Sequence, residues 1–168
     1  MIENRFIVIG DVHGCLDELT SLIKKLNLNI NDTLFFIGDL IDKGPNSVGV
    51  VKYIYNLSIK YNVKIILGNH EEKFLRYIRN KKENPKSVLA MSNTEEFEVL
   101  LDKLSEKEIE MINNSFLYFK IPKCNYLLLH AGLPENIKLN VEKKYQYSTI
   151  AKNELNRIKL ITMARMLD

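Results

Sequence analysis

Three short apolar runs alternate with helix-like patterns along the first half of the chain. The runs span residues 6–9, 34–37 and 63–67 and are rich in β-branched and aromatic side chains, a composition that favours buried strands. Each run is followed by a polar loop and then by apolar residues at helical spacing. These helical positions are Leu16, Leu19, Leu22, Ile23 and Leu26, then Val48, Val51, Ile54 and Leu57, then Phe74, Leu75 and Ile78.

The spacing of these units predicts one parallel sheet. A strand, a loop and a helix that lead to the next parallel strand take about 30 residues, and Asp11, Asp39 and Asn69 follow one another at that interval. Because such crossovers are right-handed, the three loops should meet at one edge of the sheet. We therefore expect an α/β fold with a ligand site at the carboxyl ends of its strands.

The second half of the chain predicts helices and a strand pair. Apolar residues at helical spacing between 94 and 114, with a capping box at Ser105 and Glu108, predict one or two helices. We expect a helical cap insertion at about 80–115, in which no residue suggests chemistry. Two strands at 116–121 and 126–129 and a helical tail from residue 148 complete the predicted elements.

Composition limits the class of protein. A chain of 168 residues, 46% of them hydrophobic, can form its own core, and we expect residues 1–168 to be a single domain. No apolar run approaches 18 residues, so no membrane partner is expected. Two cysteines without a paired motif, and a start unlike a signal peptide, favour the cytoplasm. A net charge of +3 argues neither for nor against nucleic acid, but a dedicated binder would usually have a denser basic face, so a nucleic-acid partner is not expected.

Side chains that can bind metal or move protons gather at the ends of the predicted strands. All three histidines of the chain lie there, in segments that also contain glycine. A mixed set of carboxylate, imidazole and amide oxygen suits Mn, Fe or Zn better than Ca or Mg. Asp39 can bridge two such ions, although its segment alone would also fit an acidic turn. The set consists of Asp11, His13, Asp39, Asp42, Asn69, His70 and His130.

The segments that carry this set resemble the signatures of a known family, the calcineurin-like metallophosphoesterases. Their order and spacing over residues 6–133 match, and the nearest branches are the bacterial and phage phosphoprotein phosphatases and the symmetrical diadenosine tetraphosphate hydrolases. The resemblance implies two packed β-sheets flanked by helices (αββα). The matching segments are Gly10-Asp11-Val12-His13-Gly14, Gly38-Asp39-Leu40-Ile41-Asp42-Lys43-Gly44, Gly68-Asn69-His70-Glu71 and Leu129-His130-Ala131-Gly132-Leu133.

The resemblance also implies a cofactor of two divalent metal ions, with Mn expected and Fe or Zn as alternatives. Asp11 and His13 correspond to ligands of the first ion, and Asp39 to the ligand that bridges both. Asn69 and His130 correspond to ligands of the second ion. The implied activity is that of a dinuclear-metal-dependent phosphoesterase, in which a metal-activated hydroxide attacks phosphomonoesters, phosphoproteins or dinucleoside polyphosphates.

Two further residues correspond to the family's proton-transfer pair. His70 matches the general acid that protonates the leaving oxygen, and Asp42 matches the carboxylate that orients it. The chemistry is consistent with this assignment, because an imidazole that titrates near neutral pH and is fixed by a carboxylate is a competent acid.

The chain departs from the family pattern at two points. Lys43 stands where the family has a phosphate-binding arginine, so a point charge replaces a bidentate fork; the alternative is a solvated loop lysine. The family also has a further histidine after His130, and this chain has no fourth histidine. Arg165 resembles the phosphate-binding arginine just before that motif. We therefore expect a truncated chain that lacks the last strands, and the alternative function is a non-catalytic remnant that binds metal or phosphate without turnover.

Overall fold

A three-stranded parallel sheet forms the centre of the protein. The computed structural model describes residues 4–121 and 124–132, and within them β1 (Phe6–Ile9), β2 (Thr33–Phe36) and β3 (Asn62–Ile65) pair in the order β1-β2-β3. The central strand β2 is buried along its whole length. The parallel register places the carboxyl ends of all three strands at one edge, as the spacing of the loops predicts.

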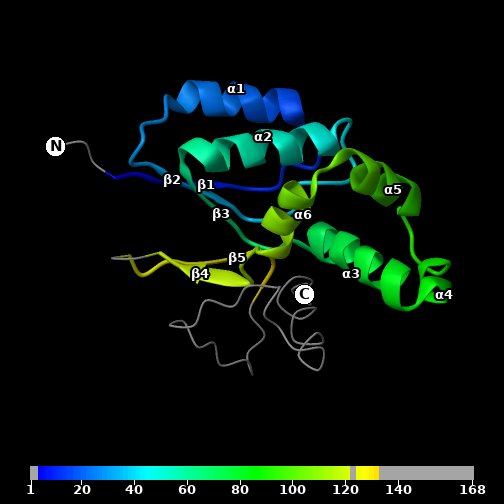
Figure 1. The fold of residues 1–168 in the computed structure, drawn as a ribbon. Coiled ribbons are helices and arrows are strands. Elements are labelled where there is room, and N and C mark those ends of the chain that lie inside the picture. The colour runs from blue at the N-terminus through cyan, green and yellow to red at the C-terminus, as the bar shows by residue number, and fades with distance from the viewer. Residues whose placement is uncertain (1–3, 122–123, 133–168) are drawn as a thin grey trace.

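Two helices cover one face of this sheet (Figure 1). Helix α1 (Leu16–Leu26) has the predicted bounds and buries Leu19 and Ile23. Helix α2 (Ser47–Lys60) begins after Asn46, whose side chain accepts a hydrogen bond from the amide of Gly49 at 2.8 Å. The predicted inner face of α2 was wrong at one position, because Val50 is fully buried and Val48 is only half-buried.

Helices α3 (Asn69–Glu83), α4 (Pro85–Val88), α5 (Thr94–Lys103) and α6 (Glu106–Asn113) follow in sequence. The helical cap insertion at about 80–115 stays a prediction. The sequence also predicts a polar, lysine-rich break at residues 80–84, and this was wrong, since α3 continues unbroken to Glu83 and ends where Pro85 interrupts the chain. Helix α5 packs against α2 and α3. The capping box at Ser105 and Glu108 is present at the start of α6.

A second, two-stranded sheet lies on the other face of the central sheet (Figure 1). Strands β4 (Tyr118–Lys120) and β5 (Leu127–Leu129) pair antiparallel and are shorter than the sequence predicts. The ring of Phe119 lies 5.2 Å from that of Phe35 in β2, so the two sheets pack through aromatic side chains. The fold is α/β, as predicted. The predicted helical tail and Arg165 lie outside the described residues.

One core of buried apolar side chains extends from β1 to β4 across the helices. A single domain over residues 1–168 stays a prediction. Within the described part of the chain, none of the helices has the length and apolar character that a membrane span requires.

Candidate active site

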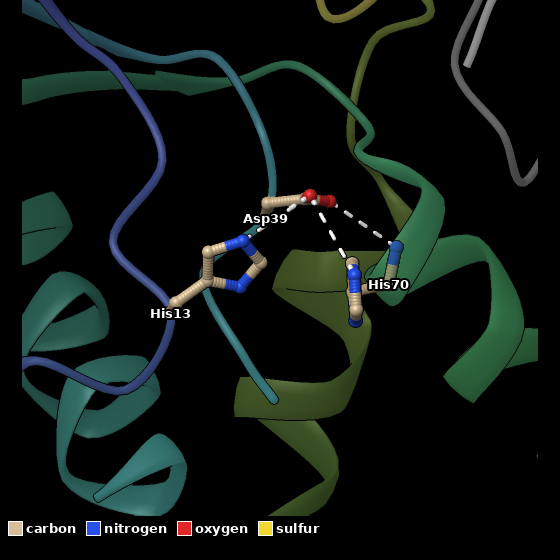
Figure 2. Close-up of side chains that lie close together, drawn as sticks. All are labelled: His13, Asp39 and His70. Atoms are coloured by element: carbon tan, nitrogen blue, oxygen red, sulfur yellow. Dashed lines mark hydrogen bonds and ion pairs between the residues drawn. The ribbon is translucent and has the colours of Figure 1, made fainter. Parts of the chain in front are cut away.

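The carboxylate of Asp39 is the point at which the strand ends converge. Asp39 follows β2 and is only 4% exposed. Its Oδ2 atom lies 3.6 Å from Nε2 of His13 and 3.8 Å from Nε2 of His70, and Figure 2 shows these two rings flanking the carboxylate. Its Oδ1 atom lies 3.3 Å from Nε2 of His130. All three histidines of the chain therefore face one carboxylate.

The remaining predicted metal ligands lie at the edges of this cluster. Asp11 Oδ2 is 3.9 Å from Nε2 of His13, and Asn69 Oδ1 is 3.1 Å from Nε2 of His130. The structure thus brings Asp11 and His13 to one side of the cluster and Asn69 and His130 to the other. Between them stands Asp39, in the position that a bridging ligand would occupy.

The orientation of the histidine rings fits a cation. His13 Nδ1 lies 3.1 Å from the carbonyl oxygen of Ile41, and His130 Nδ1 lies 2.6 Å from that of Ile37. A carbonyl oxygen only accepts, so we assign a proton to Nδ1 in both rings, which leaves Nε2 as the ring atom that faces the oxygens of Asp39. A neutral ring in this orientation presents at Nε2 a lone pair that a metal ion could bind. The donor set is the one that Mn, Fe or Zn prefers.

Asp39 and His130 shift each other's pKa values. Burial disfavours the charged form of both groups and is the largest single influence on Asp39, but the hydrogen bonds and charges of His130 and His70 together outweigh it and lower the pKa of Asp39. In the same way, Asp39 and the carbonyl of Ile37 overcome burial and raise the pKa of His130 to about 9. A metal ion would have to displace that proton, so protons and metal compete for the same Nε2 atom.

Lys43 also faces the cluster. Its Nζ atom lies 3.0 Å from Nε2 of His13, so its ammonium group is directed at the site rather than away from it. Lys43 is exposed, so the alternative of a solvated loop lysine stays open and its role in phosphate binding stays a prediction. An ammonium group there supplies positive charge beside the predicted metal ligands.

His70 and Asp42 form a hydrogen-bonded pair next to the cluster. His70 Nδ1 lies 2.8 Å from Oδ2 of Asp42, and the backbone amide of His70 donates to Oδ1 of Asp39 at 3.2 Å. The Nε2 atom of His70 is left facing the site. Together with His13 and Asp39 it also meets the geometric condition for a metal-binding group, since the three ligand atoms lie within 4.8 Å of one another. The role of His70 as acid rather than ligand stays a prediction.

The loop after β2 has an unusual backbone that other residues support. Asp39, Asp42 and Lys43 have φ values of 49°, 70° and 69°, a region that side chains with a Cβ rarely adopt. Gly38, with φ of 92°, allows the close approach of this loop to its neighbours. A Cβ on Gly38 would lie 2.6 Å from the backbone of Gly68 and 2.7 Å from Nδ1 of His130.

Several residues that support this site were not assigned a role from the sequence. Glu71 stands in one of the motifs quoted above, and its carboxylate accepts hydrogen bonds from the amides of Asp39 and Leu40. Nothing in the sequence pattern indicates these contacts. Asn93 and Glu96 belong to the region in which no residue suggested chemistry; in the structure Asn93 donates to Asp42 and Glu96 accepts from its amide. Ser47, at the start of α2, also accepts from the amide of Asp42, at 3.0 Å.

Comparison with known proteins agrees with this geometry. The asymmetrical bis(5'-nucleosyl)-tetraphosphatase of Oceanobacillus iheyensis is 34% identical over 142 residues, which cover 77% of this chain and 57% of that protein. The symmetrical bis(5'-nucleosyl)-tetraphosphatase of Buchnera aphidicola is 34% identical over 140 residues, covering 80% and 47%. The chain therefore spans roughly half the length of these curated relatives.

Two solved structures share the fold of this chain. The crystal structure of a protein assigned as a diadenosine tetraphosphatase superposes with a TM-score of 0.63 at 27% identity, covering 86% of this chain and 57% of that one. A protein serine/threonine phosphatase from Saccharomyces cerevisiae shares the fold, with a TM-score of 0.53 at 22% identity over 84% of this chain and 44% of that one. The sequence model of the calcineurin-like phosphoesterases matches residues 4–163. This chain belongs to the calcineurin-like phosphoesterase family.

Proposed function

We propose that the protein is a metal-dependent phosphoesterase whose substrates are dinucleoside polyphosphates. The observation that carries this proposal is the convergence of carboxylate, imidazole and amide groups from four strand ends around Asp39. The substrate class follows from the relatives that are 34% identical, which are bis(5'-nucleosyl)-tetraphosphatases. Phosphoproteins and simple phosphomonoesters are the alternative substrates, and the cytoplasm is the proposed location.

The proposed metal ligands divide into two groups. Asp11 and His13 would hold one divalent ion, Asn69 and His130 a second, and Asp39 would contribute to both. Mn is the proposed metal, with Fe or Zn as alternatives, because the mixed oxygen and nitrogen donors suit these ions. Bound in this way, such ions supply an acidified water and neutralise charge on the phosphoryl group.

The protein's own side chains would handle the leaving group and the substrate charge. Asp42 accepts a hydrogen bond from Nδ1 of His70 and so holds the ring with Nε2 toward the site. From Nε2, His70 would give its proton to the leaving oxygen as the bond from phosphorus to that oxygen breaks. Lys43 would attract the polyphosphate chain through its ammonium group, and Arg165, outside the described residues, is proposed for the same task.

A panel of substrates tests the proposal. Purified chain with Mn should hydrolyse diadenosine tetraphosphate faster than a phosphoserine peptide, and p-nitrophenyl phosphate should serve as a general phosphoester. Asp39→Asn should abolish all three activities, while Asp102→Asn, which makes the same change at an exposed position of α5, should leave them unchanged.

The second candidate function is binding of metal and phosphate without turnover. The observation in its favour is that the chain has three histidines, which leaves the second proposed ion with Asn69, His130 and the shared Asp39. Metal binding without hydrolysis of any substrate in the panel would favour this alternative. Turnover of diadenosine tetraphosphate that Asp39→Asn abolishes would exclude it.

A further inference from the structure

A second side chain shares the carboxylate oxygen that His70 uses. Asp42 Oδ2 accepts a hydrogen bond from His70 Nδ1 at 2.8 Å, and the same atom accepts from the amide nitrogen of Asn93. Asn93 immediately precedes α5, far along the chain from both partners. The orientation of Asp42 is therefore set from two sides, by His70 from α3 and by Asn93 from α5.

Asn93 gives up a common local role to make this contact. Asparagine at the residue before a helix usually accepts a hydrogen bond from an amide of the first turn, and that bond stabilises the helix. The side chain of Asn93 makes no such bond to α5, and its backbone is left-handed with φ of 65°. Asparagine tolerates the left-handed backbone, so the unusual feature is the missing capping bond, which the side chain exchanges for a contact with Asp42.

Glu96, one turn into α5, holds the backbone of the same residue. Its Oε1 atom accepts from the amide of Asp42 at 3.1 Å and from the hydroxyl of Ser47 at 2.6 Å. Because Asp42 has a φ of 70°, which is unfavourable for a residue with a side chain, this backbone position needs external support. Helix α5 thus contacts both the side chain and the main chain of Asp42.

Helix α5 is also fixed to the helix that carries His70. The ring of Phe97 is fully buried and lies 5.6 Å from that of Phe74 and 5.4 Å from that of Tyr77, both on α3. His70 is the second residue of α3. One face of α5 therefore packs on the helix of His70 while its first turn contacts Asp42.

We propose that Asn93 and Glu96 are positioning residues, which hold Asp42 in the orientation that fixes the His70 ring. The inference rests on the proposed roles of His70 and Asp42. It assigns to α5 the task of holding these two side chains in their hydrogen-bonded orientation. Asn93 orients the carboxylate by donating to the oxygen that His70 uses. Glu96 fixes the backbone from which that carboxylate projects.

The direct test replaces Asn93 by residues that cannot donate. Asn93→Gly suits the left-handed backbone and removes only the side chain, whereas Asn93→Asp keeps the shape but presents an acceptor to Asp42. Asn27→Gly is the matched control, because Asn27 is also left-handed, with φ of 44°, and ends α1 away from the site.

The first readout is independent of turnover. In metal-free chain with labelled histidine, the Nδ1 proton of His70 should resonate downfield because of its bond to Asp42. In Asn93→Gly and Asn93→Asp this signal should move upfield and exchange with solvent at least about 10-fold faster, while in Asn27→Gly it should not change. An unchanged His70 signal in both Asn93 variants would overturn the proposal, even if the chain has no phosphoesterase activity.

The second readout is kinetic. For wild-type chain that turns over substrate, Asn93→Gly should lower kcat by about 10- to 100-fold for alkyl phosphates, whose leaving groups need a proton, with little change in KM. The loss should be smaller for p-nitrophenyl phosphate. An equal loss on both substrates would contradict a positioning role and indicate general disorder of the site. Lack of any wild-type turnover would instead count against the proposed function.

Discussion

The backbone amide of Asp39 donates a hydrogen bond to Oε2 of Glu71 at 2.8 Å. The same fully buried carboxylate accepts from the amides of Leu40 at 2.8 Å and of Ile41 and Gly68 at 3.2 Å. These donors belong to the loops after β2 and β3, which carry proposed metal ligands. Glu71 therefore holds two ligand-bearing loops at a fixed separation. Burial and the charge of Asp39 raise the pKa of Glu71 to about 7, although the backbone donors oppose this shift.

We expect Glu71→Gln to weaken both the fold and metal binding. An amide in place of the carboxylate directs its own N–H groups at backbone donors, which should cost about 1–3 kcal/mol in the free energy of unfolding. Loss of a partner that orients ligands should lower the affinity for Mn by about 10- to 100-fold. Urea unfolding and metal titration measure the two effects.

The neighbouring Glu72 provides the control for this experiment. Its carboxylate lies 3.6 Å from the guanidinium of Arg76, one turn further along the same helix. Glu72→Gln makes the same chemical change at the neighbouring position of α3 and should leave metal affinity unchanged. If Glu71→Gln were as stable as wild type and bound Mn as tightly, the support that we assign to Glu71 would be wrong.

Replacement of His70 tests whether this residue acts as a general acid or as a metal ligand. As general acid, His70→Asn should lower kcat by about 10²–10⁴-fold while metal content per chain stays the same. The effect should shrink for good leaving groups, which need little protonation. His13→Asn is the contrast, since it should lower metal content as well as rate. Loss of metal from His70→Asn would show that His70 is a ligand, as its position near Asp39 also allows.

The sequence predicted those parts of the fold that depend on local pattern. Helix α1 has its predicted bounds because its apolar residues recur at helical spacing and Asn27 ends it in the left-handed conformation. The inner face of α2 was displaced at one position, since in a helix of mostly apolar residues periodicity does not distinguish Val48 from Val50. A lysine-rich stretch near residue 80 resembled a break, but packing of Phe74 and Tyr77 keeps α3 helical there.

The candidate site was predictable to the extent that its residues lie at strand ends. Parallel strands bring their carboxyl ends together whatever the details, so Asp11, Asp39 and Asn69 could be placed near one another from spacing alone. The supporting contacts could not be placed. Asn93 and Glu96 reach Asp42 only because α5 folds back over α2 and α3, and no local pattern encodes that packing.

Stability away from the site should depend on pH through Arg5 and Asp32. The Arg5 guanidinium donates to both oxygens of the buried Asp32, at 2.9 Å and 2.5 Å, and this lowers the pKa of Asp32 to about 2. A depressed carboxyl pKa contributes stability above its unfolded value near 4, and that contribution is lost as the pH falls toward 2.

Asp32→Asn should therefore lower Tm at pH 7 by roughly 2–8 °C, with the smaller values allowing for the exposure of Arg5. The difference from wild type should diminish below pH 4 and vanish near pH 2. Asp102→Asn, at an exposed position, should show no such difference at any pH. A Tm difference for Asp32→Asn that is the same at pH 7 and pH 2.5 would contradict the assignment.

Metal content should distinguish the two proposed ion sites. In the proposed assignment, Asp11, His13 and Asp39 would give the first ion two carboxylates and an imidazole, whereas the second would have Asn69 and His130 beside the shared Asp39. Removal of a partner of a ligand typically costs about 10- to 100-fold in affinity, so a site with fewer strong donors should bind at least that much more weakly. Elemental analysis at micromolar free Mn should find close to one ion per chain.

Thermal unfolding should report the same difference between the sites, because a ligand that binds only the folded state stabilises it by mass action. Mn at about 100 times its dissociation constant from the first site adds about 2.7 kcal/mol, which should raise Tm by roughly 5–10 °C. His13→Ala should remove this shift at micromolar Mn, and a chelator should remove it from wild type. His130→Ala should keep the shift, because it affects the weaker site. Two tightly held ions per chain, or loss of the micromolar shift in His130→Ala alone, would reverse the assignment of strong and weak sites.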